Sequence, residues 1–195
     1  MSDTLRETFT LDFLGWRPWL ERATDTKLTP EQRSAVEEAI GNAPNNDYIN
    51  VLANDLETLK TRALVHRHTY GSEEPSQVAW RELGATTTSR INGCVFCASV
   101  HARMYANASK RRDVAQQFLE DGVAAELPET ERAVVDLSEK VTNEPESLSA
   151  ADLASLRALG FDDANILDVI NYAAFFANAN RLMLTLGEPT PPKEK

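Results

Sequence analysis

The chain has 195 residues, and 20 Lys and Arg against 30 Asp and Glu give it a formal net charge of −10 at pH 7. This acidic balance argues against nucleic acid as a partner, because binding to a phosphate backbone depends on Lys and Arg. A hydrophobic content of 42% with 26% charged residues is typical of a folded chain, and no apolar run reaches the roughly 20 residues that a membrane helix needs.

The first 46 residues predict an N-terminal helical extension. Their start has no basic flank followed by an apolar block, so we expect no signal peptide and a cytoplasmic protein without membrane contact. The tetrapeptide Thr29–Gln32 is typical of a helix start, with Thr29 as N-cap and Gln32 reaching back to it. Because the extension is too short to bury its own core, we expect Phe13, Trp16 and Trp19 to anchor it on the main body or on a neighbouring subunit.

Residues 47–187 predict one all-α domain, and residues 188–195 a flexible tail. Ala occurs 25 times against 8 Gly, and β-branched residues do not alternate with polar ones, which favours helix over strand. The helices expected from periodicity and capping residues cover 47–70, 76–83, 91–108, 113–120, 130–141, 149–159 and 163–186. Residues 84–89, with three consecutive Thr, fit either a kink within one helix or a break between two.

The segment from Cys94 to His101 carries the residues with chemical potential. Cys94 and Cys97 are the two cysteines of the chain and form one C-x-x-C, which in a reducing compartment indicates redox chemistry or a metal rather than a disulfide scaffold. On one helix, Cys97 and His101 are i and i+4 and share a face, while Cys94 and Cys97 are i and i+3. Cys97 would therefore lie between a base and a disulfide partner.

A cysteine that reduces peroxide needs activation, because a free thiol with a pKa of about 8.5 is only a few per cent thiolate at pH 7. His101 is positioned by its spacing to accept the Cys97 proton. A helix N-terminus near Asn92 and Gly93 would favour the thiolate form of both cysteines. The absence of a side chain at Gly93 would help a small oxidant to approach Cys94.

Three other interpretations of the segment compete with the redox one. The cysteines can be small buried hydrophobic residues without chemistry. Together with His101, they can also bind zinc, with Glu82 or His66 as the fourth ligand, although structural zinc usually draws two ligand pairs from separate elements. A c-type haem site needs His directly after the second Cys, and Ala98 stands there. The residues alone favour redox chemistry over inert packing and place zinc behind both.

The pattern Glu82-x11-Cys94-x-x-Cys97-x-x-x-His101, preceded by Asn92-Gly93, resembles the alkylhydroperoxidase D / carboxymuconolactone decarboxylase superfamily. The resemblance covers roughly residues 47–187. Its peroxidase-related branch is similar in further short motifs of the C-terminal half, namely Ser149-x-x-Asp152, Leu156-Arg157-x-x-Gly160, Asn180-Arg181 and Leu186-Gly187.

The resemblance implies an all-helical fold, assembly into trimers or hexamers, and hydroperoxide reduction by a thiol–disulfide cycle without cofactor or metal. The apolar faces of the 47–70 and 163–186 helices also predict a homo-oligomer, since they exceed what one small bundle buries. Carried over residue by residue, Cys97 corresponds to the peroxidatic cysteine, Cys94 to the resolving one, and Glu82 and His101 to the proton relay. The expected partners are a small hydroperoxide and a cellular dithiol, such as a lipoyl-type donor.

One residue departs from the pattern. The best-known alkylhydroperoxidases have a second His immediately before the second Cys, where this chain has Phe96. The relay is therefore shorter. The decarboxylase branch lacks the cysteine pair, which disfavours that activity here. The alternative to a thiol peroxidase is a non-catalytic or redox-sensing protein on the same fold.

Overall fold

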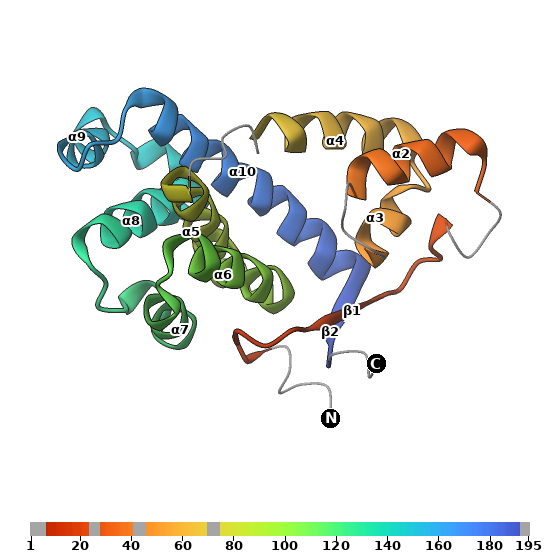
Figure 1. The fold of residues 1–195 in the computed structure, drawn as a ribbon, viewed down its shortest axis with the longest axis horizontal. Coiled ribbons are helices and arrows are strands. Elements are labelled where there is room, and N and C mark those ends of the chain that lie inside the picture. The colour runs from red at the N-terminus through yellow and green to blue at the C-terminus, as the bar shows by residue number, and fades with distance from the viewer. Residues whose placement is uncertain (1–6, 24–27, 41–45, 70–74, 192–195) are drawn as a thin grey trace.

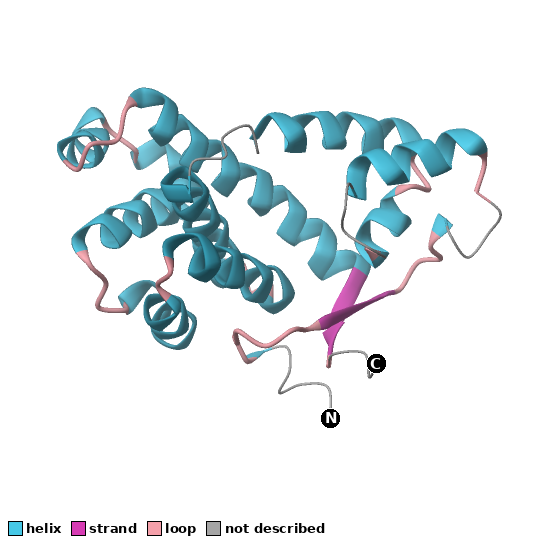
Figure 2. Ribbon diagram, in the orientation of Figure 1, coloured by secondary structure: helices cyan, strands magenta, loops and turns pink. Residues whose placement is uncertain are grey.

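A computed structural model describes residues 7–23, 28–40, 46–69 and 75–191 of the chain. The elements in chain order are β1 (Gly15–Pro18), α2 (Pro30–Ile40), α3 (Asp47–Leu52), α4 (Leu56–Thr69), α5 (Pro75–Ile91), α6 (Val95–Ser109), α7 (Arg112–Asp121), the 3₁₀ turn η2 (Gly122–Ala124), α8 (Glu129–Asn143), the 3₁₀ turn η3 (Pro145–Ser147), α9 (Ala150–Ala158), α10 (Asp163–Leu186) and β2 (Gly187–Thr190). Figure 2 shows helices throughout, with one small two-stranded ribbon. The predicted all-α class is confirmed.

Helix α5 lies at the centre of the helical body and packs against α6, α8 and α10 (Figure 1). Every residue from 81 to 89 is buried, so this helix presents no solvent face over more than two turns. A Cβ at Gly84 would lie 3.2 Å from the Ser138 hydroxyl and 3.3 Å from a Val169 methyl group, so the missing side chain allows α8 and α10 to approach closely. This packing fixes Glu82 inside the core.

The threonine-rich residues 84–89 do not break the chain, because α5 is continuous through them. The Thr86 hydroxyl donates to the Glu82 backbone carbonyl at 2.7 Å, and the Thr87 hydroxyl donates to the Leu83 carbonyl at 2.8 Å. Both hydroxyls are thus hydrogen-bonded without unwinding the helix. The helix predicted to end at residue 83 therefore continues to Ile91. The Gly71–Pro75 break predicted before this helix falls largely outside the described residues.

Two predicted helix boundaries are wrong. The 47–70 helix is split into α3 and α4, because Asp55 caps a new helix by accepting from the backbone and the hydroxyl of Thr58, and the Asn54 amide donates to the Glu21 carbonyl. The cysteine helix begins at Val95, not at Ile91, since Ile91 still belongs to α5. Gly93 separates the two helices with φ of +76°, a left-handed conformation that favours glycine.

Capping residues predicted from the sequence do set other boundaries. Thr29 and Gln32 bond reciprocally ahead of α2, with distances of 3.0 and 3.2 Å. Ser149 forms a capping box with Asp152 at α9, and Asp162 caps α10. These interactions are local in the chain, which is why the sequence alone reveals them.

The two ends of the described chain meet in an antiparallel ribbon, in which Trp16 of β1 faces Pro189 of β2. Residues 188–190 are therefore part of a strand, so the flexible tail predicted from residue 188 is corrected there. The N-terminal extension likewise contributes a strand as well as helix α2. Its predicted anchoring role holds for Trp16, which is 6% exposed, whereas Phe13 is 72% and Trp19 55% exposed.

Candidate active site

The two cysteines lie together at the start of α6, in a buried cluster formed by α3, α4, α6, α10 and β1. Both are free and buried, and their sulfur atoms are hydrogen-bonded at 2.6 Å. Cys94 is the N-cap residue, and Cys97 lies on the first turn of the helix. The i, i+3 spacing read from the sequence thus places both sulfurs in position to form a disulfide.

The two thiols are not equivalent. The hydrogen bond between the two sulfurs is the main cause that lowers the pKa of Cys94, and burial opposes it. The Cys94 sulfur makes no capping hydrogen bond, yet the backbone amide of Cys97 is close enough to lower the pKa further. Burial raises the pKa of the Cys97 thiol well above its ordinary value, and the neighbouring Cys94 raises it again. The hydrogen bond between the sulfurs thus favours loss of the Cys94 proton, and burial disfavours loss of the Cys97 proton.

Asn180 of α10 is a fully buried polar residue beside the pair. Its side-chain carbonyl accepts from the Asn92 amide at 3.1 Å, and its own amide donates to the Ser89 hydroxyl at 3.0 Å. The amide also stabilises the thiolate form of both cysteines and lowers the pKa of each. Asn180 therefore ties the end of α5, the Gly93 loop and α10 to the sulfurs.

Glu82 and His101 form a second buried pair across the α5–α6 contact. Oε2 of Glu82 lies 2.6 Å from Nδ1 of His101, and the Tyr172 hydroxyl donates to Oε1 of Glu82 at 3.2 Å. Phe176 packs against the imidazole, with ring centroids 3.9 Å apart. A carboxylate only accepts, so Nδ1 of His101 is the donor and Nε2 is left as the nitrogen that can take a proton.

The structure brings the predicted site residues together as two pairs rather than one hydrogen-bonded chain. Within the described part of the molecule, no hydrogen bond links His101 to either sulfur, although His101 follows Cys97 by one helical turn. Cys97 Sγ instead contacts Met183 Sδ of α10 at 3.4 Å. That His101 accepts the Cys97 proton stays a prediction.

A cavity of about 170 Å³ opens beside Cys94. Its walls come from three places in the chain, the Gly93–Phe96 segment, the end of α10, and the β1–β2 ribbon. The lining residues are Trp16, Gly93, Cys94, Val95, Phe96, Met183, Leu184, Gly187, Glu188 and Pro189. Cys94 is on this wall and Cys97 is not. A small, mostly apolar molecule could thus reach one sulfur of the pair.

Comparisons with known proteins bear on the segment that carries the cysteines and on the fold. Residues 77–140, which include both cysteines, Glu82 and His101, match the carboxymuconolactone decarboxylase family. A solved structure of an alkylhydroperoxidase AhpD core, an uncharacterized peroxidase-related protein from Ralstonia eutropha JMP134, is 24% identical over 88% of this chain and 90% of that chain, with a TM-score of 0.73. The chain has the AhpD-like fold.

A second AhpD-like neighbour has the same overall similarity. An uncharacterized peroxidase-related protein from Silicibacter sp. TM1040 is 23% identical over 87% of this chain and 89% of that chain, with a TM-score of 0.73. None of the curated proteins is significantly similar to the chain. The resemblance expected from the cysteine motif is thus confirmed for the family segment and for the fold.

The described residues contain no cluster of side chains suited to bind a metal ion. No group of three or more His, Cys, Asp and Glu side chains within residues 7–23, 28–40, 46–69 and 75–191 could hold a metal ion. The zinc interpretation therefore lacks a ligand set here, because Glu82 and His101 bind one another away from the cysteines. Over the same residues, no helix is both long and apolar enough to cross a bilayer.

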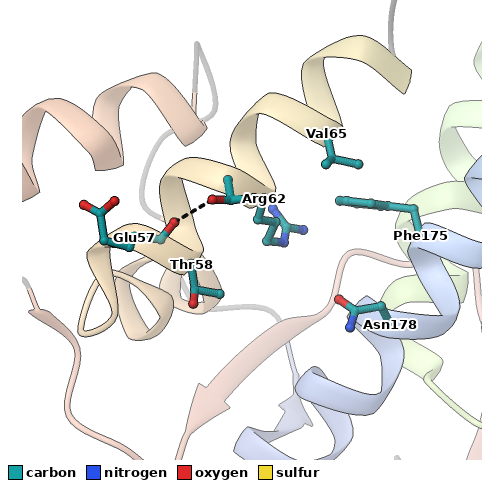
Figure 3. Close-up of a pocket in the computed structure, with 7 residues that line it drawn as sticks. Glu57, Thr58, Arg62, Val65, Phe175 and Asn178 are labelled. Carbon is teal, nitrogen blue, oxygen red and sulfur yellow. Dashed lines mark hydrogen bonds between the residues drawn. The ribbon is translucent and has the colours of Figure 1, made fainter.

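A larger cavity of about 470 Å³ lies between α4 and α10 (Figure 3). Arg62 and Phe175 project toward one another in it, with the guanidinium carbon 5.0 Å from the Phe175 ring centroid. The same guanidinium lies 5.2 Å from the ring of Tyr48, a buried residue of the cysteine cluster. Burial raises the pKa of Tyr48, and Arg62 opposes that shift.

Sequence reasoning missed several residues of the site. Trp16, Tyr48, Asn180 and Met183 reach the cysteines from elements that are remote in the chain. Only Asn180 carried a usable signal, since a polar residue on the apolar face of α10 is expected to be buried and hydrogen-bonded. Trp16 was expected only to anchor the N-terminal extension, and the sequence pattern at Tyr48 and Met183 is that of ordinary core residues.

Proposed function

We propose that this protein is a thiol-dependent peroxidase that reduces organic hydroperoxides or hydrogen peroxide through a Cys94–Cys97 dithiol/disulfide cycle. The observation that carries the proposal is the pair of free, buried sulfurs 2.6 Å apart beside a small cavity. Sulfurs at this distance are close enough to pass from dithiol to disulfide.

The proposed cycle consumes one hydroperoxide per dithiol. A thiolate attacks the terminal peroxide oxygen, the O–O bond breaks, and the alkoxide leaves and takes a proton to become an alcohol. The sulfenic acid formed on the first sulfur is then attacked by the second, which forms the S–S bond and releases water. Two electrons pass from the cysteines to the peroxide. An external dithiol, for which a lipoyl-type donor is our candidate, reduces the disulfide again.

Glu82 and His101 are proposed to handle the protons of this cycle. The Glu82 carboxylate orients the imidazole through Nδ1, so that Nε2 can receive a proton released by the cysteines and return it to the leaving oxygen. The missing hydrogen bond between His101 and the sulfurs means that a water molecule or a side-chain rotation must complete the path. Phe96 cannot serve as a second relay, because its side chain is apolar.

The proposal includes a homo-oligomer. Leu64 and Val65 of α4 and Leu167 of α10 are 50%, 48% and 56% exposed, which is unusual for large apolar side chains of an isolated chain. A trimer or hexamer, as the AhpD resemblance implies, would cover such residues. Light scattering at micromolar concentration tests this part separately from the chemistry.

The alternative is a redox-sensing protein on the same fold. The separation of the His101 pair from the cysteine pair favours it, since a sensor needs a disulfide but no efficient proton relay. The two functions differ in turnover, because a peroxidase consumes many hydroperoxide molecules with a reductant and a sensor forms its disulfide once.

The deciding experiment measures hydroperoxide consumption with dithiothreitol or dihydrolipoamide as reductant. We expect multiple turnovers by the wild-type protein and none by the double variant Cys94→Ser, Cys97→Ser. A single disulfide formed without turnover under every reductant would favour the sensor. Peroxide consumption that survives in the double variant would exclude a cysteine-based peroxidase.

A further inference from the structure

We infer that the cavity between α4 and α10 binds a small organic carboxylate, whose charged end pairs with Arg62 and whose apolar part lies against Val65 and Phe175. We call this cavity, which has a volume of about 470 Å³, the Arg62 pocket. The inference goes beyond the proposed peroxidase function and does not rest on it, because the lining of the pocket includes neither cysteine and neither Glu82 nor His101.

Two aromatic rings hold the Arg62 guanidinium in the pocket. Its carbon lies 5.2 Å from the centroid of the Tyr48 ring and 5.0 Å from that of Phe175. Figure 3 shows Arg62 of α4 and Phe175 of α10 projecting toward one another. The rings keep the cation in place, but they cannot replace the oxygen acceptors that its N–H donors require.

The charge of Arg62 is not neutralised within the described residues. Its Nε is buried without a hydrogen-bond partner, and no carboxylate of these residues forms an ion pair with the guanidinium. Glu57, which also lines the pocket, pairs instead with Lys60 at 3.2 Å, and its carboxylate points away from Arg62 in Figure 3. A partly buried charge without a partner is unfavourable, so an anion that enters the pocket would gain charge-assisted hydrogen bonds.

Two neighbouring side chains respond to the charge of Arg62. Burial raises the pKa of Tyr48 and Arg62 opposes that rise, whereas burial and Arg62 both lower the pKa of His66. Both effects of Arg62 are those of a positive charge, which favours a phenolate and disfavours an imidazolium. This side of the pocket is therefore positive, on a chain whose net charge is −10.

The size and the walls of the pocket indicate the class of ligand. A volume of about 470 Å³ lies within the roughly 300–1,000 Å³ of pockets that bind small molecules. Beside Arg62, Val65 and Phe175 form an apolar wall, and the hydroxyls of Thr58 and Thr61 already donate to acceptors of the same chain segment. One guanidinium fork next to an apolar wall suits a monocarboxylate with an alkyl or aryl part. Inorganic phosphate would use the charge but leave the wall in water.

A carboxylate side chain from a second copy of the chain is the competing occupant, because the proposed oligomer would cover Leu64 and Val65 of α4. A single Asp or Glu side chain would fill only a small part of a pocket of this volume. We therefore assign the pocket to a free carboxylate, and the experiments below separate the two occupants.

The ligand class is tested by calorimetric titration of the full-length protein with octanoate as the probe. We expect saturable binding at one site per chain. Octanamide, which has the same alkyl chain without the charge, should bind roughly tenfold or more weakly, the scale of a hydrogen bond to a charged group, and inorganic phosphate should not compete. Equal affinities for octanoate and octanamide, or no saturable binding of octanoate, would overturn the inference.

The site is tested with Arg62→Gln, which should weaken octanoate binding by roughly tenfold or more. Arg157→Gln removes the same charge from an ion pair with Asp163 outside the pocket and should leave octanoate binding unchanged. Because Arg62→Gln can disturb packing around the guanidinium, Val65→Glu is the second test. Position 65 is 48% exposed and follows Arg62 by one helical turn, so the new carboxylate should pair with the guanidinium and abolish octanoate binding.

Octanoate binding with wild-type affinity in either Arg62→Gln or Val65→Glu would overturn the site. Light scattering on the same proteins distinguishes the competing occupant. A smaller oligomer in Arg62→Gln, together with no octanoate binding by the wild type, would assign the guanidinium to a subunit contact and overturn the inference. None of these measurements requires peroxide turnover, so failure of the peroxidase proposal would not change their result.

Discussion

The carboxylate of Glu82 holds the imidazole of His101 at 2.6 Å, although the two residues belong to different helices and are 19 positions apart. The contact exists because α5 and α6 turn back on one another through the Gly93 loop. Both side chains are buried, at 0% and 4% exposure, so water does not compete for either. Such a pair fixes the imidazole with Nε2 directed away from the carboxylate.

The variant Glu82→Gln keeps the shape of this pair and removes its charge. We expect peroxide reduction to slow by roughly 10- to 100-fold, at or below the low end of what general acid–base catalysis contributes. The dependence of the rate on pH should change as well, which a purely structural role would not cause. Tyr172→Phe, which keeps the aromatic ring and loses the second hydrogen bond to Glu82, is the matched control and should be affected less. An unchanged rate and pH profile in Glu82→Gln would remove Glu82 from the mechanism.

Asn180 should set the reactivity of the cysteines. A hydrogen bond to a charged group contributes about 1.5 kcal/mol, which corresponds to about one pKa unit. In Asn180→Leu the pH at which the Cys94 thiol is half-alkylated by iodoacetamide should therefore rise. Asn178→Leu, at an exposed position of the same helix, should leave the alkylation profile as it is. Identical profiles in both variants would show that Asn180 serves packing alone.

Gly187 should be needed for the closed ribbon. In Gly187→Ala the new methyl group collides with the Trp16 ring and the Arg17 carbonyl, so β1 must shift outward. We expect the free energy of unfolding to fall by about 1–3 kcal/mol, the usual cost of overpacking. The tryptophan emission maximum should also shift to longer wavelength, toward that of an exposed indole. Urea unfolding followed by fluorescence measures both. Wild-type stability together with wild-type emission would argue against the close contact.

His66 should make the fold sensitive to acid. Burial, with Arg62 and His101 nearby, lowers the pKa of His66 from its ordinary 6.5 to about 4. Between these values the unfolded chain binds the proton more readily than the folded one, so stability rises with pH from 4 to 6.5 and is lost as pH falls through that window. Lowering the pH from 7 to 4.5 should therefore decrease the Tm of His66→Gln by less than it decreases the Tm of the wild type. Parallel losses of Tm in the two proteins would contradict this prediction.

The sequence predicts the parts of this molecule that depend on near neighbours. The caps at Thr29, Ser149 and Asp162 and the continuous spacing of the last helix are local patterns, and the C-x-x-C with His101 follows from helical geometry. The split after Leu52 was missed because Asp55 is a polar residue within an apolar repeat, and its capping role becomes visible only with Asn54 bound to the distant Glu21 carbonyl.

The environment of the sulfurs is less predictable for the same physical reason. Trp16 reaches the cysteine cluster only through a ribbon that pairs the two ends of the chain, and Asn180 is 86 positions after Cys94. Neither contact follows from helical periodicity. The difference in pKa between Cys94 and Cys97 comes from their mutual hydrogen bond and from burial, and burial depends on how distant elements pack around the sulfurs, so spacing alone does not predict it.

The central step of the proposed cycle, the oxidation of the Cys94–Cys97 dithiol by a hydroperoxide, is tested most directly by the stoichiometry of one turnover without reductant. The fully reduced protein is mixed with excess cumene hydroperoxide, and the alcohol formed is quantified while intact and peptide masses are recorded. We predict one alcohol per chain and the loss of two hydrogen atoms, located in a Cys94–Cys97 disulfide. Two free thiols remaining after incubation with the hydroperoxide, or no alcohol formed at all, would contradict the account.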